Sequence, residues 1–331
     1  MSPRLLVTAA LAGLVALVLG AVAWALIGDA ARHTAVVPDP TQIDYVVVPH
    51  PDDEFQAWSL LERDDSTYKV FILLTRGEQT AFCEPGAYAA GWQRDLEPPA
   101  EPRPRGRWTP SCERARLTSW VSFFAEQAKS DKTLPGDLRP TGTSDALPAP
   151  RGLVCRQDQD DTCVVDTTAE VWLDAAGRGA LVALNLGDGD LTPREVAWAV
   201  RTVRKHRHGL GIDVRLSKGG LIGASFANST YDCFEYPHPD HLAVHEALYE
   251  IDFNMAYQAG ATCADDPDVA WSRIVSPRSA AAAFSVDQDG TRTGAHTASY
   301  GWLAKPYYKL DRQAQRRLFH TKQEFWVRFV N

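Results

Sequence analysis

The hydrophobic residues of this chain fall into short continuous runs and into longer stretches at helical spacing. The valine-rich run at Asp44–Val48 shows no polar alternation, which is typical of a parallel strand buried on both faces. A helical stretch at Asp53–Arg63 and a second apolar run at Tyr68–Leu74 follow it. This strand–helix–strand order predicts a right-handed crossover and a parallel sheet.

The same patterns predict further elements of an α/β domain. A helix is expected at Arg114–Ala128, and another begins at Thr192 with an N-cap, a proline and a glutamate and ends near Lys205. The other predicted strands are Val164–Leu173, Leu181–Leu186, Ile212–Leu216 and Leu221–Ser225, and the other predicted helices are His241–Tyr249 and Tyr308–Phe329. The sequence therefore predicts a single domain over residues 44–331.

An uncharged hydrophobic run precedes this domain. It extends from Leu5 to Ile27, and as a helix it is long enough to cross a hydrocarbon core of about 30 Å. Because the run exceeds the core of a usual signal peptide, residues 1–30 are predicted to be an uncleaved signal anchor in the cell membrane, with the domain outside the cytoplasm. Cleavage near Ala30, which would release a secreted protein, stays open. Residues 31–43 are then a linker.

Composition, charge and cysteines are consistent with an exported globular protein. The 331 residues are 45% hydrophobic and 23% charged, which is ordinary for a globular domain. The net charge of -8 disfavours nucleic acid as the main partner. The 6 cysteines all follow the hydrophobic run and form no CxxC pair, which favours disulfides. They allow fifteen connectivities, of which neighbours in the sequence suggest Cys83–Cys112, Cys155–Cys163 and Cys233–Cys263.

Two short segments concentrate residues that bind metals. The chain reads PHPDDE at residues 49–54, directly after the valine-rich strand, and HPDH at residues 238–241. Together they supply two imidazoles and a carboxylate as ligands, with another carboxylate and imidazole beside them. Three protein ligands and one open position are typical of a catalytic zinc site. Taken separately, each segment could instead be a turn that caps the following helix.

These two segments resemble the signature of the PIG-L/LmbE family of zinc-dependent N-acetylglucosamine deacetylases, which includes enzymes of mycothiol and bacillithiol synthesis. Weaker similarities are TRGE at residues 75–78, LGDGDL at 186–191 and a final helix with HTKQ at 320–323. The resemblance implies a Rossmann-like, mostly parallel sheet flanked by helices. Loop insertions near residues 79–111 and 129–161 depart from the family, so its sugar-contacting residues are not carried over.

The resemblance also implies a role for each residue of the site. It implies three zinc ligands, namely His50, Asp53 and His241. Asp52 becomes the general base for a metal-activated water, and His238 stabilises the tetrahedral intermediate. Asp240 either orients a ligating imidazole or caps a helix, and His320 either reaches the site or is structural. Fe²⁺ is an alternative to Zn²⁺, because imidazole and carboxylate suit both metals.

The sequence therefore predicts an extracytoplasmic amidohydrolase that removes the acetyl group from an N-acetylglucosamine-type sugar or glycoconjugate. The reaction type follows from the metal ligands and the base, whereas the sugar follows from the resemblance alone. The expected partners are the glycan substrate and, through the N-terminal run, the membrane. Two alternatives stay open: an amidase or deacylase of another amide, such as a thiol conjugate or a secondary metabolite, and a non-catalytic glycan-binding envelope protein.

Overall fold

The structure is a computed structural model in which a compact unit extends from Asp39 to Asn331. The residues that it describes are 39–61, 64–77, 110–143, 147–148, 156–157, 163–164, 166–212, 215–225, 238–261, 272–275 and 323–329. The predicted membrane anchor at 1–30, most of the insertion at 79–111, the side chains of the cysteines and His320 lie outside this set. Among the helices of the described part, none combines the length and the apolar character needed to cross a membrane.

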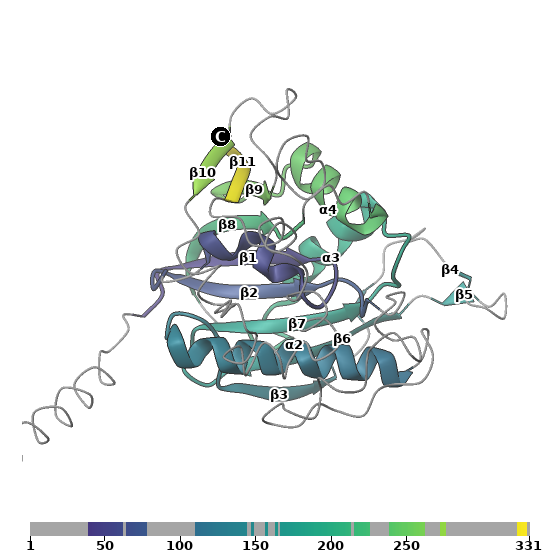
Figure 1. Cartoon of the computed structure of the whole chain (residues 1–331), viewed down its shortest axis with the longest axis horizontal. Helices are drawn as coiled ribbons and strands as arrows, with labels where there is room; N and C mark the ends of the chain where they lie inside the picture. The colour runs from purple at the N-terminus through teal and green to yellow at the C-terminus, as the bar shows by residue number, and fades with distance from the viewer. Residues whose placement is uncertain are drawn as a thin grey trace, which may run out of the picture. The chain divides into compact units, whose positions relative to one another are not determined.

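In the described part, nine strands form one mixed sheet in the order β10-β11-β9-β8-β1-β2-β7-β6-β3 (Figure 1). The five central strands, from β9 to β7, pair in parallel, and the two strands at each edge pair antiparallel. The strands are β1 (Gln42–Val48), β2 (Thr67–Leu73), β3 (Leu138–Thr143), β6 (Asp166–Asp174), β7 (Gly179–Asn185), β8 (Ser217–Gly223), β9 (Tyr257–Ala261), β10 (Ser272–Val275) and β11 (Gln323–Phe329). Strands β4 (Arg156–Gln157) and β5 (Cys163–Val164) form a separate pair.

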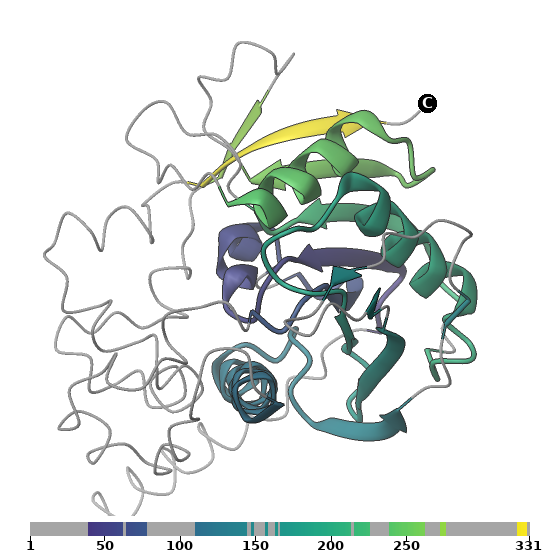
Figure 2. The ribbon, with the colours of Figure 1, turned by 90° about the vertical axis from the view of Figure 1, so that its right-hand side faces the viewer.

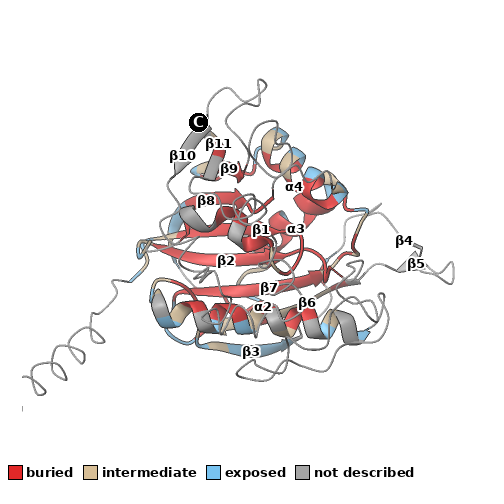
Figure 3. Cartoon of the chain, in the orientation of Figure 1, coloured by how far each residue is buried: buried red, intermediate tan, exposed pale blue. Residues whose placement is uncertain are grey.

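Helices cover both faces of this sheet. The central strands β1, β2 and β7 are buried almost throughout, as the continuous apolar runs predicted (Figure 3). In β1, Tyr45 and Val47 belong to the core with α3 (Pro193–His206) and α4 (Pro239–Glu250), whereas Val46 and Val48 belong to the core with η1 and α2. The bounds of the latter two are Asp53–Leu60 and Pro110–Ser130. Figure 2 shows α2 end-on, on the opposite side of the sheet from α3.

The α/β class is confirmed, but several finer predictions were wrong. The sheet is mixed rather than mostly parallel: a tight turn makes β6 and β7 antiparallel, and β3, β10 and β11 also pair antiparallel with their neighbours. The helix expected at Asp53–Arg63 is a shorter 3₁₀ helix, and the described residues of Ile212–Leu216 form no strand. Residues 323–329, the described end of the predicted C-terminal helix, are strand β11. The insertion near 129–161 contains strand β3, and β1 begins within the predicted linker 31–43.

Candidate metal centre

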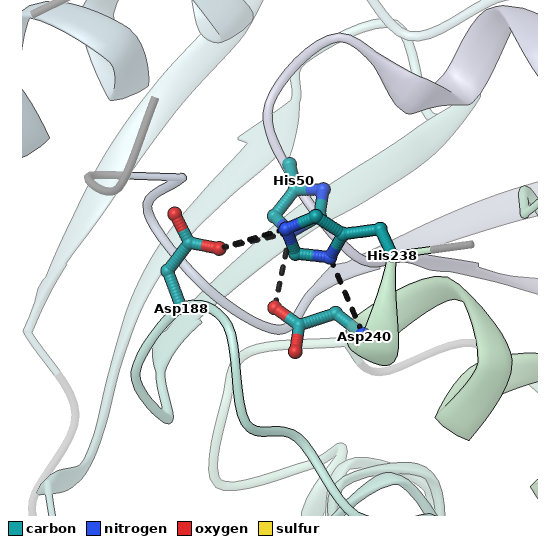
Figure 4. Close-up of side chains that lie close together, drawn as sticks. All are labelled: His50, Asp188, His238 and Asp240. Carbon is teal, nitrogen blue, oxygen red and sulfur yellow. Dashed lines mark hydrogen bonds and ion pairs between the residues drawn. The ribbon is translucent and has the colours of Figure 1, made fainter. Parts of the chain in front are cut away.

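The candidate metal centre is formed by two loops and one helix start. The loop after β1, with the first residue of η1, carries His50 and Asp53, the loop after β7 carries Asp188, and the first turn of α4 carries Asp240 and His241. Because β1 and β7 belong to the parallel part of the sheet, their carboxyl ends lie at the same edge, where α/β proteins bind ligands. Figure 4 shows side chains from all three places around the imidazole of His50.

The turn after β1 places His50 and Asp53 against each other. The backbone N–H of Asp53 donates to the carbonyl of His50 at 3.2 Å, and the backbone N–H of His50 donates to Asp53 Oδ2 at 3.1 Å. The same Oδ2 lies 2.9 Å from His50 Nδ1, while Gln56 Nε2 donates to Asp53 Oδ1 at 2.7 Å. The carboxylate is therefore fixed by its own turn and by the following 3₁₀ helix.

His241 completes a buried group of three possible ligands. Its Nε2 lies 3.1 Å from Asp53 Oδ2, and the three residues offer ligand atoms that all lie within 4.8 Å of one another. Bonds of about 2.1 Å to a tetrahedral zinc would separate such atoms by about 3.4 Å. The contacts of 2.9 and 3.1 Å to Asp53 Oδ2 are only a few tenths of an ångström shorter. His50, Asp53 and His241 could therefore hold a metal ion.

The second nitrogen of His50 faces two carboxylates. Its Nε2 lies 3.0 Å from Asp240 Oδ2 and 3.1 Å from Asp188 Oδ1. Asp240 also accepts the backbone N–H groups of Gly189 and Leu191, each at 2.9 Å. His50, Asp188, His238 and Asp240 thus form a second group of possible ligands, which shares His50 with the first. Asp240 is already held by two backbone donors, so its contact with Nε2 could orient the imidazole of His50 with Nδ1 towards Asp53.

The electrostatics of the site reflect this crowding of carboxylates. Burial lowers the pKa of His50, but its hydrogen bonds with Asp188, Asp240 and Asp53 outweigh burial, so the pKa is raised well above the usual value. Burial raises the pKa of Asp53. The charges and hydrogen bonds of His241 and His50 lower it by more than burial raises it, so the pKa lies below its usual value. So many buried carboxylates favour cations, and a divalent metal ion would neutralise them.

Asp52 lies beside the three possible ligands but contacts a different partner. Its Oδ1 lies 3.2 Å from Nη2 of Arg116, and 21% of its side chain is exposed. Burial raises the pKa of Asp52, the charge of Arg116 lowers it, and the charge of Asp53 raises it. The net result is a pKa of about 7. Its backbone has φ of 121°, a conformation that residues other than glycine rarely adopt. Such strain is typical of functional sites.

His238 is the N-cap residue of α4. Its Nδ1 accepts the backbone N–H of Asp240 at 3.3 Å, so the ring proton is on Nε2. That nitrogen lies 3.9 Å from Asp188 Oδ1, and 25% of the side chain is exposed. Burial, followed by the nearby His50, lowers the pKa of His238. The neutral ring, with an Nε2–H donor, is therefore the form that the fold favours.

The structure brings together His50, Asp52, Asp53, His238, Asp240 and His241, the candidate residues that it describes. It adds two residues that the sequence did not single out as candidates, Asp188 and Arg116. Asp188 belongs to the LGDGDL segment, and the weak similarity of that segment to the family was the available signal for a site residue there. Arg116 lies inside an amphipathic helix and carried no signal of its own.

Comparisons with protein-family models, with curated proteins and with solved structures found no match for this chain. The PIG-L/LmbE resemblance therefore stays a prediction.

Proposed function

We propose that this chain is a metal-dependent amidohydrolase of the PIG-L/LmbE type, which removes the acetyl group from an N-acetylglucosamine-type sugar or glycoconjugate outside the cytoplasm. The observation that carries this proposal is the position of Asp52. Its backbone is strained, its carboxylate is partly exposed, and it directly precedes Asp53, one of the three possible metal ligands. A carboxylate in this position could accept a proton from water that a bound metal ion polarises.

The three possible ligands, His50, Asp53 and His241, would hold Zn²⁺ or Fe²⁺. The bound ion would supply a Lewis acid that polarises water and a carbonyl oxygen. Asp52 accepts the proton that the attacking water loses, and passes a proton to the amine nitrogen as the C–N bond breaks. His238 donates its Nε2–H to the carbonyl oxygen as negative charge develops there. Water and the amide thereby become acetic acid and a free amine, and the acid then loses its proton to give acetate.

Other parts of the proposal have separate support. The acetylated sugar and the LmbE-like, Rossmann-like description of the fold are supported by the sequence segments PHPDDE and HPDH. The extracytoplasmic location is supported by the hydrophobic run at Leu5–Ile27 and by the even number of cysteines.

Acetate release tests the proposal. The full chain, loaded with zinc to one ion per molecule, is incubated with N-acetylglucosamine, its oligomers and cell-wall glycans. We expect acetate from the wild type and a loss of about three orders of magnitude or more in Asp52→Asn, because the amide cannot accept the proton. Asp137→Asn is the matched control, since that carboxylate is 62% exposed and directly precedes the edge strand β3.

Two results would overturn separate parts of the proposal. A wild-type chain that holds one zinc ion and releases no acetate from any of these substrates excludes the acetylated sugar. An Asp52→Asn variant that keeps its turnover excludes Asp52 as the base. Bound metal is measured in each variant, so that a loss of turnover through loss of the ion is recognised.

A further inference from the structure

Arg116 is a buried arginine of α2 whose hydrogen bonds reach both loops beside the candidate site. Its side chain is 4% exposed. Nη2 donates to the carbonyl of Pro51 at 2.8 Å and to Asp52 Oδ1 at 3.2 Å, and Nε donates to the carbonyl of Arg76 at 3.2 Å. The guanidinium therefore ties the loop after β1 to the loop after β2. Its planar fork of donors suits this task, whereas a lysine could not make the same set of bonds.

Gly77 leaves the space in which this guanidinium lies. It has φ of +62°, and a Cβ atom placed on it would lie 2.7 Å from Nη2 and 2.8 Å from Nε of Arg116. Any side chain at this position would therefore push the guanidinium away. Thr75, two residues earlier, donates its hydroxyl to the carbonyl of Pro49 at 2.9 Å and accepts the Gly77 N–H at 3.2 Å. Thr75 and Gly77, two residues of the TRGE segment, therefore both shape the contact between the loop after β1 and the loop after β2.

The backbone of Asp52 is held from the same helix. Its N–H donates to Glu54 Oε2 at 3.2 Å, and this oxygen also accepts the indole N–H of Trp120 at 3.1 Å. Trp120 lies four residues after Arg116, and residues at this spacing lie on the same face of a helix. One face of α2 therefore restrains both the strained backbone and the carboxylate of Asp52.

We propose that Arg116 is a positioning residue that aims the carboxylate of Asp52 for proton transfer. This inference rests on the proposed function, in which Asp52 is the general base. Arg116 holds Oδ1 and thereby fixes the plane of the carboxylate, so that Oδ2 is the oxygen that receives the proton. Proton transfer depends steeply on such geometry, and a displacement of about 1 Å can lower a rate by about two orders of magnitude.

Replacing the guanidinium tests this role. In the zinc-loaded full chain we expect Arg116→Lys and Arg116→Ala to lower kcat by about tenfold to a hundredfold, with KM and bound zinc nearly unchanged. Methylguanidinium added at non-denaturing concentration should restore part of the kcat of Arg116→Ala, which a general loss of structure would not allow. Full turnover in Arg116→Lys, or a loss that follows loss of zinc, would overturn the proposal. Arg139→Lys, whose side chain is 72% exposed on β3, is the control.

Alanine substitutions at two glycines give a matched pair of variants, of which only one should displace the guanidinium of Arg116, and neither changes that side chain. Gly77 and Gly177 have similar left-handed backbones, with φ of +62° and +72°, but a Cβ atom at Gly177 would meet nothing within 4 Å. Alanine therefore meets a similar backbone cost at both positions and displaces Arg116 only from position 77. We expect Gly77→Ala to lower kcat as Arg116→Ala does, and Gly177→Ala to leave it unchanged. Equal turnover in the two glycine variants would contradict the role of Arg116.

A measurement without substrate separates this inference from the proposed function. If the wild type releases no acetate, the proposed function fails, and thermal unfolding of the full chain still tests the contact between Arg116 and Asp52. Asp52→Gly removes the carboxylate and accommodates the positive φ. Arg116→Met should lower Tm in the wild-type background and lower it clearly less in the Asp52→Gly background, where the guanidinium has lost its charged partner. Equal shifts of Tm in both backgrounds would overturn the inference.

Discussion

Asp240 joins three parts of the candidate site through one carboxylate. It is fully buried at the start of α4, accepts the backbone N–H groups of Gly189 and Leu191, and contacts Nε2 of His50. Of the two roles that the sequence left open, these contacts support that of orienting His50. A carboxylate at the far nitrogen of a ligating imidazole fixes its tautomer and raises its basicity.

Asp240→Asn should therefore weaken metal binding. Both carboxylate oxygens face N–H donors, so the amide group of asparagine would place a donor against a donor at one of them. We expect the zinc affinity to fall by about tenfold to a hundredfold, measured by competition with a chelator. Asp188→Asn should have a smaller effect, because the amide oxygen of asparagine can still accept the Nε2 proton of His50 in place of Oδ1. A folded Asp240→Asn chain with unchanged zinc affinity would exclude this role for Asp240.

At the scale of residues, the sequence indicated the candidate ligands but not their surroundings. His50, Asp52 and Asp53 are adjacent in one turn, so their proximity needed no knowledge of the fold. The approach of His241 followed from placing both segments at loops of an α/β sheet. The contacts of Asp188 and Arg116 depend instead on the order of β1, β2 and β7 in the sheet and on how α2 packs against it, and no local pattern encodes that arrangement.

Among the elements, helix α3 shows how a local signal can specify a boundary. Thr192 accepts the backbone N–H of Glu195 at 3.3 Å, and Glu195 accepts the backbone N–H of Thr192 at 2.9 Å, with Pro193 between them at the first helical position. This capping box was predicted from the sequence, because its donors and acceptors lie within four residues. No distant part of the chain has to be placed to recognise it.

Removing this cap should destabilise the chain measurably. Thr192→Ala deletes the hydroxyl that accepts the Glu195 N–H, and we expect the free energy of unfolding to fall by about 1 kcal/mol. Thr192→Ser keeps the hydroxyl and should restore most of the loss. Urea unfolding of the full chain, followed by circular dichroism, measures both. If the alanine and serine variants were equally stable, the hydroxyl would not contribute.

Strand β11 shows the opposite case, in which the local pattern misled. Two adjacent residues of this strand, Phe325 and Trp326, are both almost fully buried. Phe325 lies in the core with α2, and Trp326 lies in the core with α3. A strand covered on both faces has no alternation, so an apolar run of this kind is compatible with either a helix or a strand. The strand forms because β9 and β10 supply its backbone partners, and these lie far away in the sequence.

At the scale of the whole molecule, the sheet has a centre that the sequence predicts and edges that it does not. The parallel strands β1, β2 and β7 follow from continuous apolar runs and from the connections between them. The antiparallel pairs at both edges join β3 with β6 and β10 with β11, and these pairings depend on contacts between distant segments. The candidate site lies at the predictable centre, which explains why its main residues could be proposed without the fold.

The sheet also contains a buried carboxylate away from the candidate site. Asp44 of β1 is 2% exposed, and its Oδ1 accepts the backbone N–H of Gly220 in β8 at 2.7 Å. Burial raises the pKa of Asp44 more than this hydrogen bond lowers it, so that the pKa lies at about 6 instead of 3.8. The folded chain therefore binds a proton at Asp44 more tightly than the unfolded chain does.

This difference makes a prediction about stability and pH. The stabilisation from a protonated Asp44 is fully present below the unfolded pKa of 3.8 and is lost as the pH rises through about 6. Asp44→Asn keeps an oxygen for the Gly220 N–H and cannot ionise, so the variant should gain on the wild type as the pH rises, by up to about 3 kcal/mol at neutral pH. Urea unfolding of both chains between about pH 4 and about pH 7 measures the gap, and the comparison cancels the titration of the other carboxylates. A gap that stays constant over this range would mean that Asp44 ionises equally well in the folded and unfolded chains.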